Sequence, residues 1–181
     1  MDGLPNRKEI ALVVVDVQER FRPVIFEFDR VIANCSKLIQ AFKVLEAPIV
    51  PTEQYPKGLG PTIPEIARLL EETPIEKIEF SCMRNPGFAQ RLKDLKVRSI
   101  ALCGIEAHVC VLQTALDAIR EGIEVYFVED AISSRKETDW RIAAQRLAQS
   151  GVWRASTEML LFQLLERAGS DAFKEVQKIV K

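Results

Sequence analysis

Short apolar runs alternate with segments of helical periodicity along the whole chain. Six runs are rich in Val, Ile and other apolar residues, and between them apolar residues recur every three or four positions. Continuous apolar runs are typical of strands in a parallel sheet that is covered on both faces. The alternation therefore predicts an α/β fold with a largely parallel sheet.

The expected elements follow from this pattern and from local capping and breaking signals. Strands are predicted at residues 9–15, 48–52, 76–80, 98–103, 123–128 and 152–155. Helices are predicted at residues 29–46, 64–72, 85–95, 107–120, 137–149 and 157–168, and the tail from Ser170 is expected to dock as a helix. Asn85 before Pro86 indicates a helix start, and Thr157 is expected to cap another helix. The Pro- and Gly-rich residues 53–64 are predicted to form a loop.

Length and charge limit the classes of protein that fit. A chain of 181 residues without a repeat or linker fits a single domain, residues 1–181, with a full hydrophobic core. The net charge of −1 gives no reason to expect a nucleic-acid partner or an anionic membrane surface. The apolar runs are far shorter than the ~20 residues that a membrane span needs. The N-terminal segment does not resemble a secretory signal, so a cytoplasmic location is expected.

The cysteines and the single histidine restrict the chemistry further. The four cysteines have no CxxC spacing, which argues against a disulfide framework and favours reduced thiols. His108 is the only histidine, so a site that needs several imidazoles is not expected. We therefore predict that the protein holds no metal ion.

Residues 99–119 form a strand–turn–helix signature, with Gly104 at the bend and Cys110 in the first turn of the expected helix. Unpaired N–H groups at a helix N-terminus favour an anion, and cysteines there have depressed pKa values. Cys110 is therefore a candidate nucleophile, although a cysteine between two valines is equally expected as core filling. Core packing is the preferred interpretation for the other cysteines, Cys35, Cys82 and Cys103.

Two charged residues are candidate partners for a reactive thiol. Asp16 ends a run of three valines and is either a general base or a carboxylate that caps a loop. Lys77 lies in an expected strand and either stabilises a thiolate or points to solvent. His108 is two residues from Cys110 on the expected helix and so does not face it, which favours a scaffold or pocket-lining role. The loop that begins with Gln54 and Tyr55 is either a substrate lid or a plain connection.

Three separated motifs carry a resemblance to a known family. VVVDVQERF lies at the first expected strand, Lys77 in the third, and CGIEAHVCV at the turn before a helix. With these motifs in this order, the chain resembles the isochorismatase-like cysteine hydrolases over essentially its full length. TEQYPKGLGPT and VEDAISSR are closest to the eukaryotic isochorismatase-domain-containing proteins. The resemblance implies a three-layer α-β-α fold with a six-stranded, mostly parallel Rossmann-like sheet, and a triad of Asp16, Lys77 and Cys110.

The resemblance also implies a reaction. Family members have a cis peptide in the nucleophile turn, which here would join Ile105 and Glu106 and direct the N–H groups of Glu106 and Cys110 at a developing oxyanion. The implied activity is hydrolysis of the C–N bond of a small amide-type molecule through a thioester on Cys110, without a cofactor. Substrate-lining positions are expected at Phe21, Gln54, Tyr55 and His108.

Departures from better-known relatives narrow the expectation. Nicotinamidases of the superfamily use a histidine-rich metal site, which a chain with one histidine does not have, and Ala107 stands where relatives often have Thr. Relatives are commonly homo-oligomers, so a homo-oligomer is expected, and the apolar C-terminal helix serves either assembly or packing on its own subunit. The alternative class is a catalytically silent member of the same fold that binds a small molecule or a protein.

Overall fold

In the computed structural model, which describes residues 3–181, six strands form one sheet in which every neighbouring pair is parallel. The strands lie in the order β3-β2-β1-β4-β5-β6. Their bounds are β1 Ile10–Val15, β2 Ile49–Gln54, β3 Ile75–Lys77, β4 Ser99–Ile105, β5 Glu124–Ser133 and β6 Trp153–Ala155. The predicted α/β fold with a parallel sheet is therefore confirmed.

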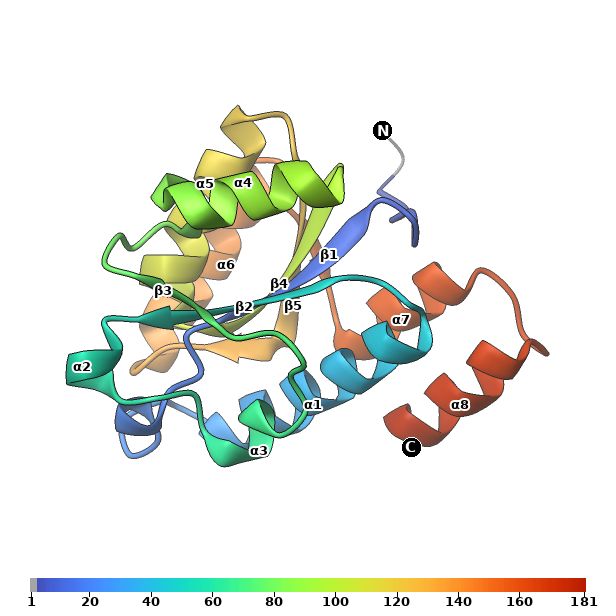
Figure 1. Ribbon diagram of the computed structural model, residues 1–181, viewed down its shortest axis with the longest axis horizontal. Coiled ribbons are helices and arrows are strands. Elements are labelled where there is room, and N and C mark those ends of the chain that lie inside the picture. Colours follow the sequence, from blue (N-terminus) through green and yellow to red (C-terminus); the bar gives the residue numbers. More distant parts are fainter. Residues whose placement is uncertain (1–2) are drawn as a thin grey trace.

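Helices connect the strands and cover both faces of the sheet (Figure 1). The α-helices are α1 Phe28–Val44, α2 Pro56–Leu59, α3 Pro64–Ala67, α4 Pro86–Leu95, α5 Leu112–Arg120, α6 Glu137–Gln149, α7 Thr157–Leu165 and α8 Asp171–Val180. Shorter turns are η1 Glu19–Phe21, η2 Cys82–Arg84 and η3 Ala107–Val111, of which η3 is π-helical.

β1 divides the core into two halves, because successive side chains of a strand point to opposite faces of the sheet. Ile10 and Leu12 pack with residues of α1, α3, α7 and α8, whereas Ala11 and Val13 pack with residues of α4, α5 and α6. Figure 1 shows these two groups of helices on opposite sides of the sheet. This arrangement gives the three layers.

The carboxyl ends of the strands share one rim of the sheet. β1 lies between β2 and β4, so the order of the strands reverses there, which is where open α/β sheets bind ligands. Gly104 makes the close contact of β4 with β1 possible, since its φ is +105° and a Cβ atom would lie 2.1 Å from the carbonyl oxygen of Val15.

The C-terminal helix packs on its own chain. Val176 of α8 is fully buried in the same core half as α1, and Lys37 Nζ of α1 donates to the carbonyl oxygen of Val180 at 3.2 Å. The Phe173 ring meets the Phe162 ring edge to face, with 6.0 Å between their centroids. The predicted docking of the tail as a helix is confirmed.

Several boundaries differ from the sequence-based expectations. β3 ends at Lys77 instead of residue 80, because the chain then curls around the Lys77 ammonium, which donates to the carbonyl oxygens of Glu79 and Phe80. The prediction of a loop throughout residues 53–64 was wrong, since Pro56 opens the short helix α2. The helix expected at residues 64–72 ends at Ala67. β5 runs on to residue 133 after a register shift against β4.

The predicted caps were right in one case and wrong in the other. Asn85 caps α4, with its Oδ1 atom accepting from Phe88 N at 3.1 Å. The cap of α7 is Ser156 instead of Thr157, because Ser156 Oγ accepts from the N–H of Met159. Thr157 instead donates through N and Oγ1 to Oδ1 of Asp130, both at 2.8 Å.

None of the helices among residues 3–181 is long and apolar enough to cross a membrane.

Candidate active site

A buried ion pair lies at the rim where the strand order reverses. Asp16 follows β1 directly, and Lys77 is the last residue of β3, so β2 separates them in the sheet. Lys77 Nζ donates to Asp16 Oδ2 at 2.7 Å, and the side chains are 0% and 1% exposed. The second carboxylate oxygen, Asp16 Oδ1, accepts from Thr52 Oγ1 at 2.8 Å. Both oxygens of Asp16 are therefore held by neighbours.

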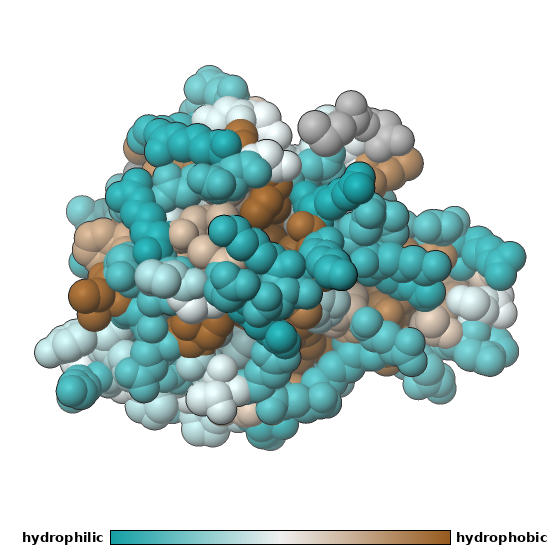
Figure 2. Space-filling view, turned by 45° about the horizontal axis from the view of Figure 1, so that its top comes forward, coloured by the Kyte–Doolittle hydropathy of each residue, from teal (hydrophilic) through white to brown (hydrophobic). Residues whose placement is uncertain are grey.

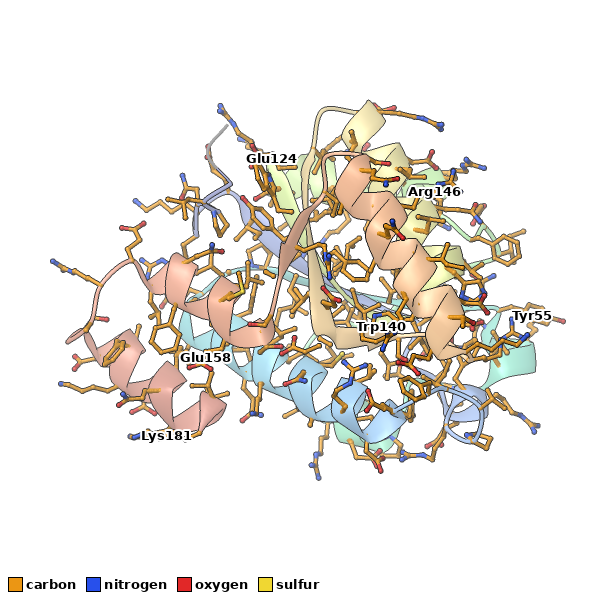
Figure 3. All side chains as sticks on the ribbon, turned by 180° about the vertical axis from the view of Figure 1, so that it is seen from behind. Tyr55, Glu124, Trp140, Arg146, Glu158 and Lys181 are labelled. Atoms are coloured by element: carbon orange, nitrogen blue, oxygen red, sulfur yellow. The ribbon has the colours of Figure 1, made fainter. Side chains whose placement is uncertain are left out.

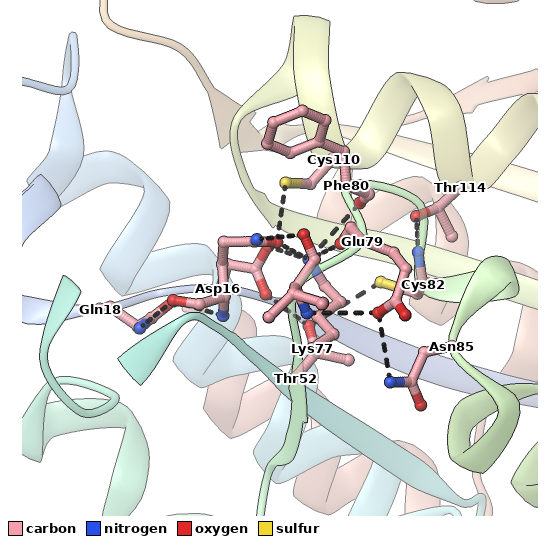
Figure 4. Close-up of polar contacts among 12 residues, drawn as sticks. Asp16, Gln18, Thr52, Lys77, Glu79, Phe80, Cys82, Asn85, Cys110 and Thr114 are labelled. Carbon is pink, nitrogen blue, oxygen red and sulfur yellow. Dashed lines mark hydrogen bonds and ion pairs between the residues drawn. The ribbon is translucent and has the colours of Figure 1, made fainter. Parts of the chain in front are cut away.

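The Lys77 ammonium is surrounded by acceptors (Figure 4). Besides Asp16, it donates to Gln54 Oε1 at 2.6 Å, and it lies 3.3 and 3.4 Å from the carbonyl oxygens of Glu79 and Phe80. An ammonium has three N–H groups, so these acceptors saturate it. Burial acts to lower the pKa of Lys77, but the charge of Asp16, its hydrogen bond and the nearby thiols Cys82 and Cys110 together outweigh it, and the pKa lies above its ordinary value. Lys77 is therefore a fixed positive charge in this site.

Gln54 is held so that its oxygen faces the ammonium. Its Nε2 group donates to the carbonyl oxygen of Ile78 at 2.9 Å, which leaves Oε1 for Lys77. The backbone of Gln54 is clamped by Gln18, whose Oε1 accepts from Gln54 N at 2.8 Å and whose Nε2 donates to Gln54 O at 3.0 Å. Gln18 Nε2 also donates to the carbonyl oxygen of Gly60 at 2.6 Å, which joins the loop after α2 to the same network.

Cys110 lies on the π-helical turn η3, one residue before the turn gives way to α5. It is 6% exposed, and its Sγ atom lies 3.9 Å from Gln54 Oε1, the oxygen that also accepts from Lys77. Burial raises the pKa of Cys110, the Asp16 carboxylate raises it further, and the charge of Lys77 opposes both only in part. The resting site therefore holds a thiol, whereas a helix N-terminus alone would have favoured a thiolate.

A second thiol lies close to the ion pair. Cys82 in η2 is fully buried, and its Sγ atom lies 3.9 Å from Thr52 Oγ1. Burial raises the pKa of Cys82 to about 11, and the charge of Asp16 adds to the effect. Cys82 is fully buried among apolar side chains of the core half that contains α4 and α5, which fits the expected role of core packing.

The turn that precedes Cys110 carries its own polar cluster. The Ile105–Glu106 peptide bond is cis, and Glu106 Oε2 accepts from Arg135 Nε at 3.0 Å and from Arg135 N at 3.2 Å. His108 Nδ1 lies 2.9 Å from Ser134 Oγ, while its Nε2 lies 4.0 Å from Asp139 Oδ2. These contacts tie η3 to the end of β5 and the start of α6.

Residues 10–159 match the Isochorismatase domain. The chain belongs to the isochorismatase domain family. Isochorismatase domain-containing protein 2 of Danio rerio is 44% identical to it over 180 residues, which cover 98% of this chain and 90% of that relative.

Solved structures of isochorismatase-fold proteins superpose closely on the chain. A structure named MAR1 ribonuclease from Caenorhabditis elegans has a TM-score of 0.92 and 42% identity, covering 97% of this chain and 91% of the other. The YcaC gene product of Escherichia coli, described as an octameric hydrolase of unknown specificity, has a TM-score of 0.89 at 22% identity, covering 97% and 89%. At 22% identity, the similarity to the Escherichia coli protein shows a shared fold alone.

In this isochorismatase family member, the structure brings together most of the residues expected from the sequence. Asp16, Lys77, Gln54 and Cys110 form one connected group. Tyr55 follows Gln54 on the outer side, where Figure 3 shows it at the edge of the molecule beside α2. Phe21 instead packs against the core half that contains α1.

Other contacting residues were not anticipated from the sequence. Thr52 donates to the Asp16 carboxylate, and Gln18 accepts from the backbone N–H of Gln54. The carbonyl oxygen of Phe80 accepts from the Lys77 ammonium. Gln18 could have been predicted as a site residue, because it lies two residues after Asp16. No local sequence pattern marks Thr52 or Phe80 as site residues. Within residues 3–181 no group of three or more His, Cys, Asp or Glu side chains is arranged to hold a metal ion.

Proposed function

We propose that this isochorismatase family member is a cysteine hydrolase that cleaves the C–N bond of a small amide-type molecule with Cys110 as the nucleophile. The observation that carries the proposal is the buried Asp16–Lys77 pair, joined at 2.7 Å, with the Cys110 thiol beside it. Two buried charges of this kind are costly to maintain, and replacing them with apolar residues is often neutral or stabilising. A catalytic use explains why they are present.

The first step is a proton transfer that leaves the net charge of the site unchanged. Asp16 takes the proton of the Cys110 thiol, so the negative charge moves from the carboxylate to the sulfur while Lys77 stays positive. The ion pair with Lys77 is thereby replaced by a thiolate beside the same ammonium. This explains how a thiol with a raised pKa serves as a nucleophile when substrate is bound.

The remaining steps regenerate the thiol. The Cys110 sulfur attacks the carbonyl carbon, and the N–H groups of Glu106 and Cys110 stabilise the tetrahedral oxyanion. Asp16 returns its proton to the leaving nitrogen as the C–N bond breaks, which leaves a thioester on Cys110. Asp16 then takes a proton from water, the hydroxide oxygen attacks the thioester, and the proton passes to the departing sulfur. Gln54, Tyr55 and His108 are proposed to line the pocket, whereas Phe21 packs against the core half that contains α1.

The proposal is tested by a panel of small amides, with mass spectrometry of the intact protein to detect the acyl intermediate. We expect ammonia or amine release with a mass increase on Cys110, and complete loss of both in Cys110→Ala. Cys35→Ala, which removes a buried thiol in the other core half, is the matched control and keeps both signals. A Cys110→Ala protein that hydrolyses the same amide at the wild-type rate would contradict the proposal.

RNA cleavage is a second candidate, because the structure from Caenorhabditis elegans at 42% identity is named a ribonuclease. Incubation of the wild-type protein with a mixed-sequence RNA tests it. Cleavage that survives Cys110→Ala would favour a phosphodiesterase that does not depend on the thiol. No amide hydrolysis, no RNA cleavage and no alkylation of Cys110 would favour a catalytically silent binding protein.

The assembly and location of the protein are part of the proposal. Asp16, Lys77 and Cys110 all lie on or next to strands of one sheet, which supports a single catalytic domain over residues 1–181. The octameric state of the Escherichia coli protein supports a homo-oligomer, which light scattering on the purified protein would test. The four cysteines are free and buried, which fits a reducing cytoplasm.

A further inference from the structure

Three large apolar side chains are exposed where the chain leaves the site. Tyr55, Ile78 and Phe80 are 54%, 76% and 54% exposed, and we call them the apolar rim. Each lies one to three residues from Gln54 or Lys77, and Figure 2 shows apolar surface on the side of the molecule that carries β3 and α2. Single exposed apolar residues are ordinary, but a group beside a reactive site indicates a binding surface.

The rim residues belong to one hydrogen-bonded unit with the site. Tyr55 N donates to the carbonyl oxygen of Lys77 at 2.9 Å, the Ile78 carbonyl accepts from Gln54, and the Phe80 carbonyl faces the ammonium. Figure 4 draws the Phe80 ring and the Cys110 thiol on the same side of Lys77. The positions of the rim side chains are therefore set by the same backbone that holds the catalytic charges.

The hollow next to the rim is small and has no surplus of positive charge. Its volume is about 310 Å³, and Tyr55 and Ile78 line it together with Glu76, Glu79, Lys57 and Lys77. Two of these residues are acidic and two are basic. The hollow therefore combines apolar surface with no net charge, which gives an anionic ligand no electrostatic advantage.

The cation inside the site is already paired. The three N–H groups of the buried Lys77 ammonium meet four acceptor oxygens, and outside it Arg135 donates through Nε to Glu106. Recognition of a carboxylate or phosphate group requires free N–H donors, as a bidentate arginine provides. An anionic group beside Cys110 would have to compete with Asp16 for the buried Lys77 ammonium, which is unfavourable.

From these observations we propose that the substrate is an uncharged amide with an apolar substituent, which packs on the apolar rim, and that Phe80 determines this specificity. The inference rests on the proposed function of Cys110. It excludes small carboxylates and nucleic-acid phosphates as substrates of the thiol.

The test uses matched alkylating probes on the intact protein, with the modified cysteine identified by peptide mass spectrometry. Iodoacetamide and iodoacetate have nearly the same size but differ by one negative charge, and N-benzyl iodoacetamide adds an apolar ring. Each rate is divided by the rate with a cysteine-containing reference peptide at the same pH. We expect Cys110 to prefer iodoacetamide over iodoacetate, and the benzyl probe over iodoacetamide, each by at least about tenfold.

Variants assign the preference to the rim. Phe80→Ala is expected to lower the benzyl preference to the value of the reference peptide, and Phe80→Leu to keep part of it. Phe162→Ala, an exposed phenylalanine on α7, is the matched control and retains the full preference. Equal or faster labelling by iodoacetate, or a benzyl preference that survives Phe80→Ala, would overturn the inference while leaving the nucleophile intact. A Cys110 that none of the probes modifies overturns the proposed function and the inference together.

Discussion

At the scale of single residues, the site depends on where one proton resides. Asp16 and Cys110 both adjoin Lys77, and only one of them needs to be negative for the ammonium to have a counter-charge. The raised pKa of the thiol follows from its burial and from the charge that Asp16 already carries. The carboxylate and the ammonium therefore act on Cys110 in opposite directions.

This opposition predicts the pH dependence of Cys110 alkylation in two variants. Asp16→Asn removes a negative charge that raises the thiol pKa, so the labelling midpoint shifts to lower pH by about one unit or more. Lys77→Met removes a positive charge that lowers the thiol pKa, so the midpoint shifts to higher pH. Labelling with iodoacetamide across a pH series, read on the Cys110 peptide, measures both. Asp16→Asn should lose amide hydrolysis even though its thiol ionises more readily.

The double variant Asp16→Asn/Lys77→Met controls for stability. Each single variant leaves one buried charge without a partner, which costs about 3–5 kcal/mol, whereas the double variant removes both charges. Urea denaturation should therefore find the double variant more stable than either single one. Shifts of the same sign in Asp16→Asn and Lys77→Met would contradict the assigned roles.

At the scale of elements, the close approach of β4 to β1 sets the geometry of the rim. Gly104 has a φ of +105°, and a side chain there would collide with the backbone of Val15, the residue directly before Asp16. The turn that carries Glu106 and Cys110 starts from this crossing. Its placement next to the ion pair therefore depends on a glycine in a buried strand.

Replacement of this glycine predicts a large loss of stability. Gly104→Ala puts a Cβ atom 2.1 Å from a backbone oxygen, so β4 must move, and we expect a loss of more than about 3 kcal/mol in the free energy of unfolding. Gly122→Ala is the matched control, because its φ of +77° is also positive but nothing lies within 4 Å. Its expected cost is about 1–2 kcal/mol. Equal losses in urea denaturation would show that the close approach is not what requires the glycine.

At the scale of the whole molecule, the C-terminal helix completes the layer on the α1 side of the sheet. The helix α8 has one apolar face, and its central residue Val176 is fully buried against the same core half as α1. The packing is intramolecular, so this face is not free to join a second copy. A homo-oligomer would have to use other surfaces.

This packing predicts a stability change that does not depend on protein concentration. Val176→Ala should lower the free energy of unfolding by about 2 kcal/mol, by the loss of buried methyl groups and the cavity they leave. The difference from the wild type should be the same in thermal unfolding at widely separated protein concentrations. Glu175→Ala, an exposed neighbour on α8, should change stability by no more than about 0.5 kcal/mol. A difference that grows with concentration would place α8 in an interface between subunits.

The sequence by itself determined the fold class, most element positions and the cap at Asn85. These are properties of short segments: apolar periodicity distinguishes strands from helices, and capping depends on residues within one helical turn. It also placed Asp16 and Cys110 after strands of a parallel sheet, which puts them at one rim. For Lys77 the residues left two roles open, and the family resemblance favoured the catalytic one.

Only the tertiary structure decided which side chains meet. Lys77 lies 61 positions from Asp16 in the sequence, and their contact requires the order β3-β2-β1 and the register of all three strands. The same packing turned the oxygen of Gln54 toward the ammonium and buried Cys110 deeply enough to raise its pKa. Contacts between distant segments and the removal of water are properties of the packed sheet, and no local pattern in the chain encodes them.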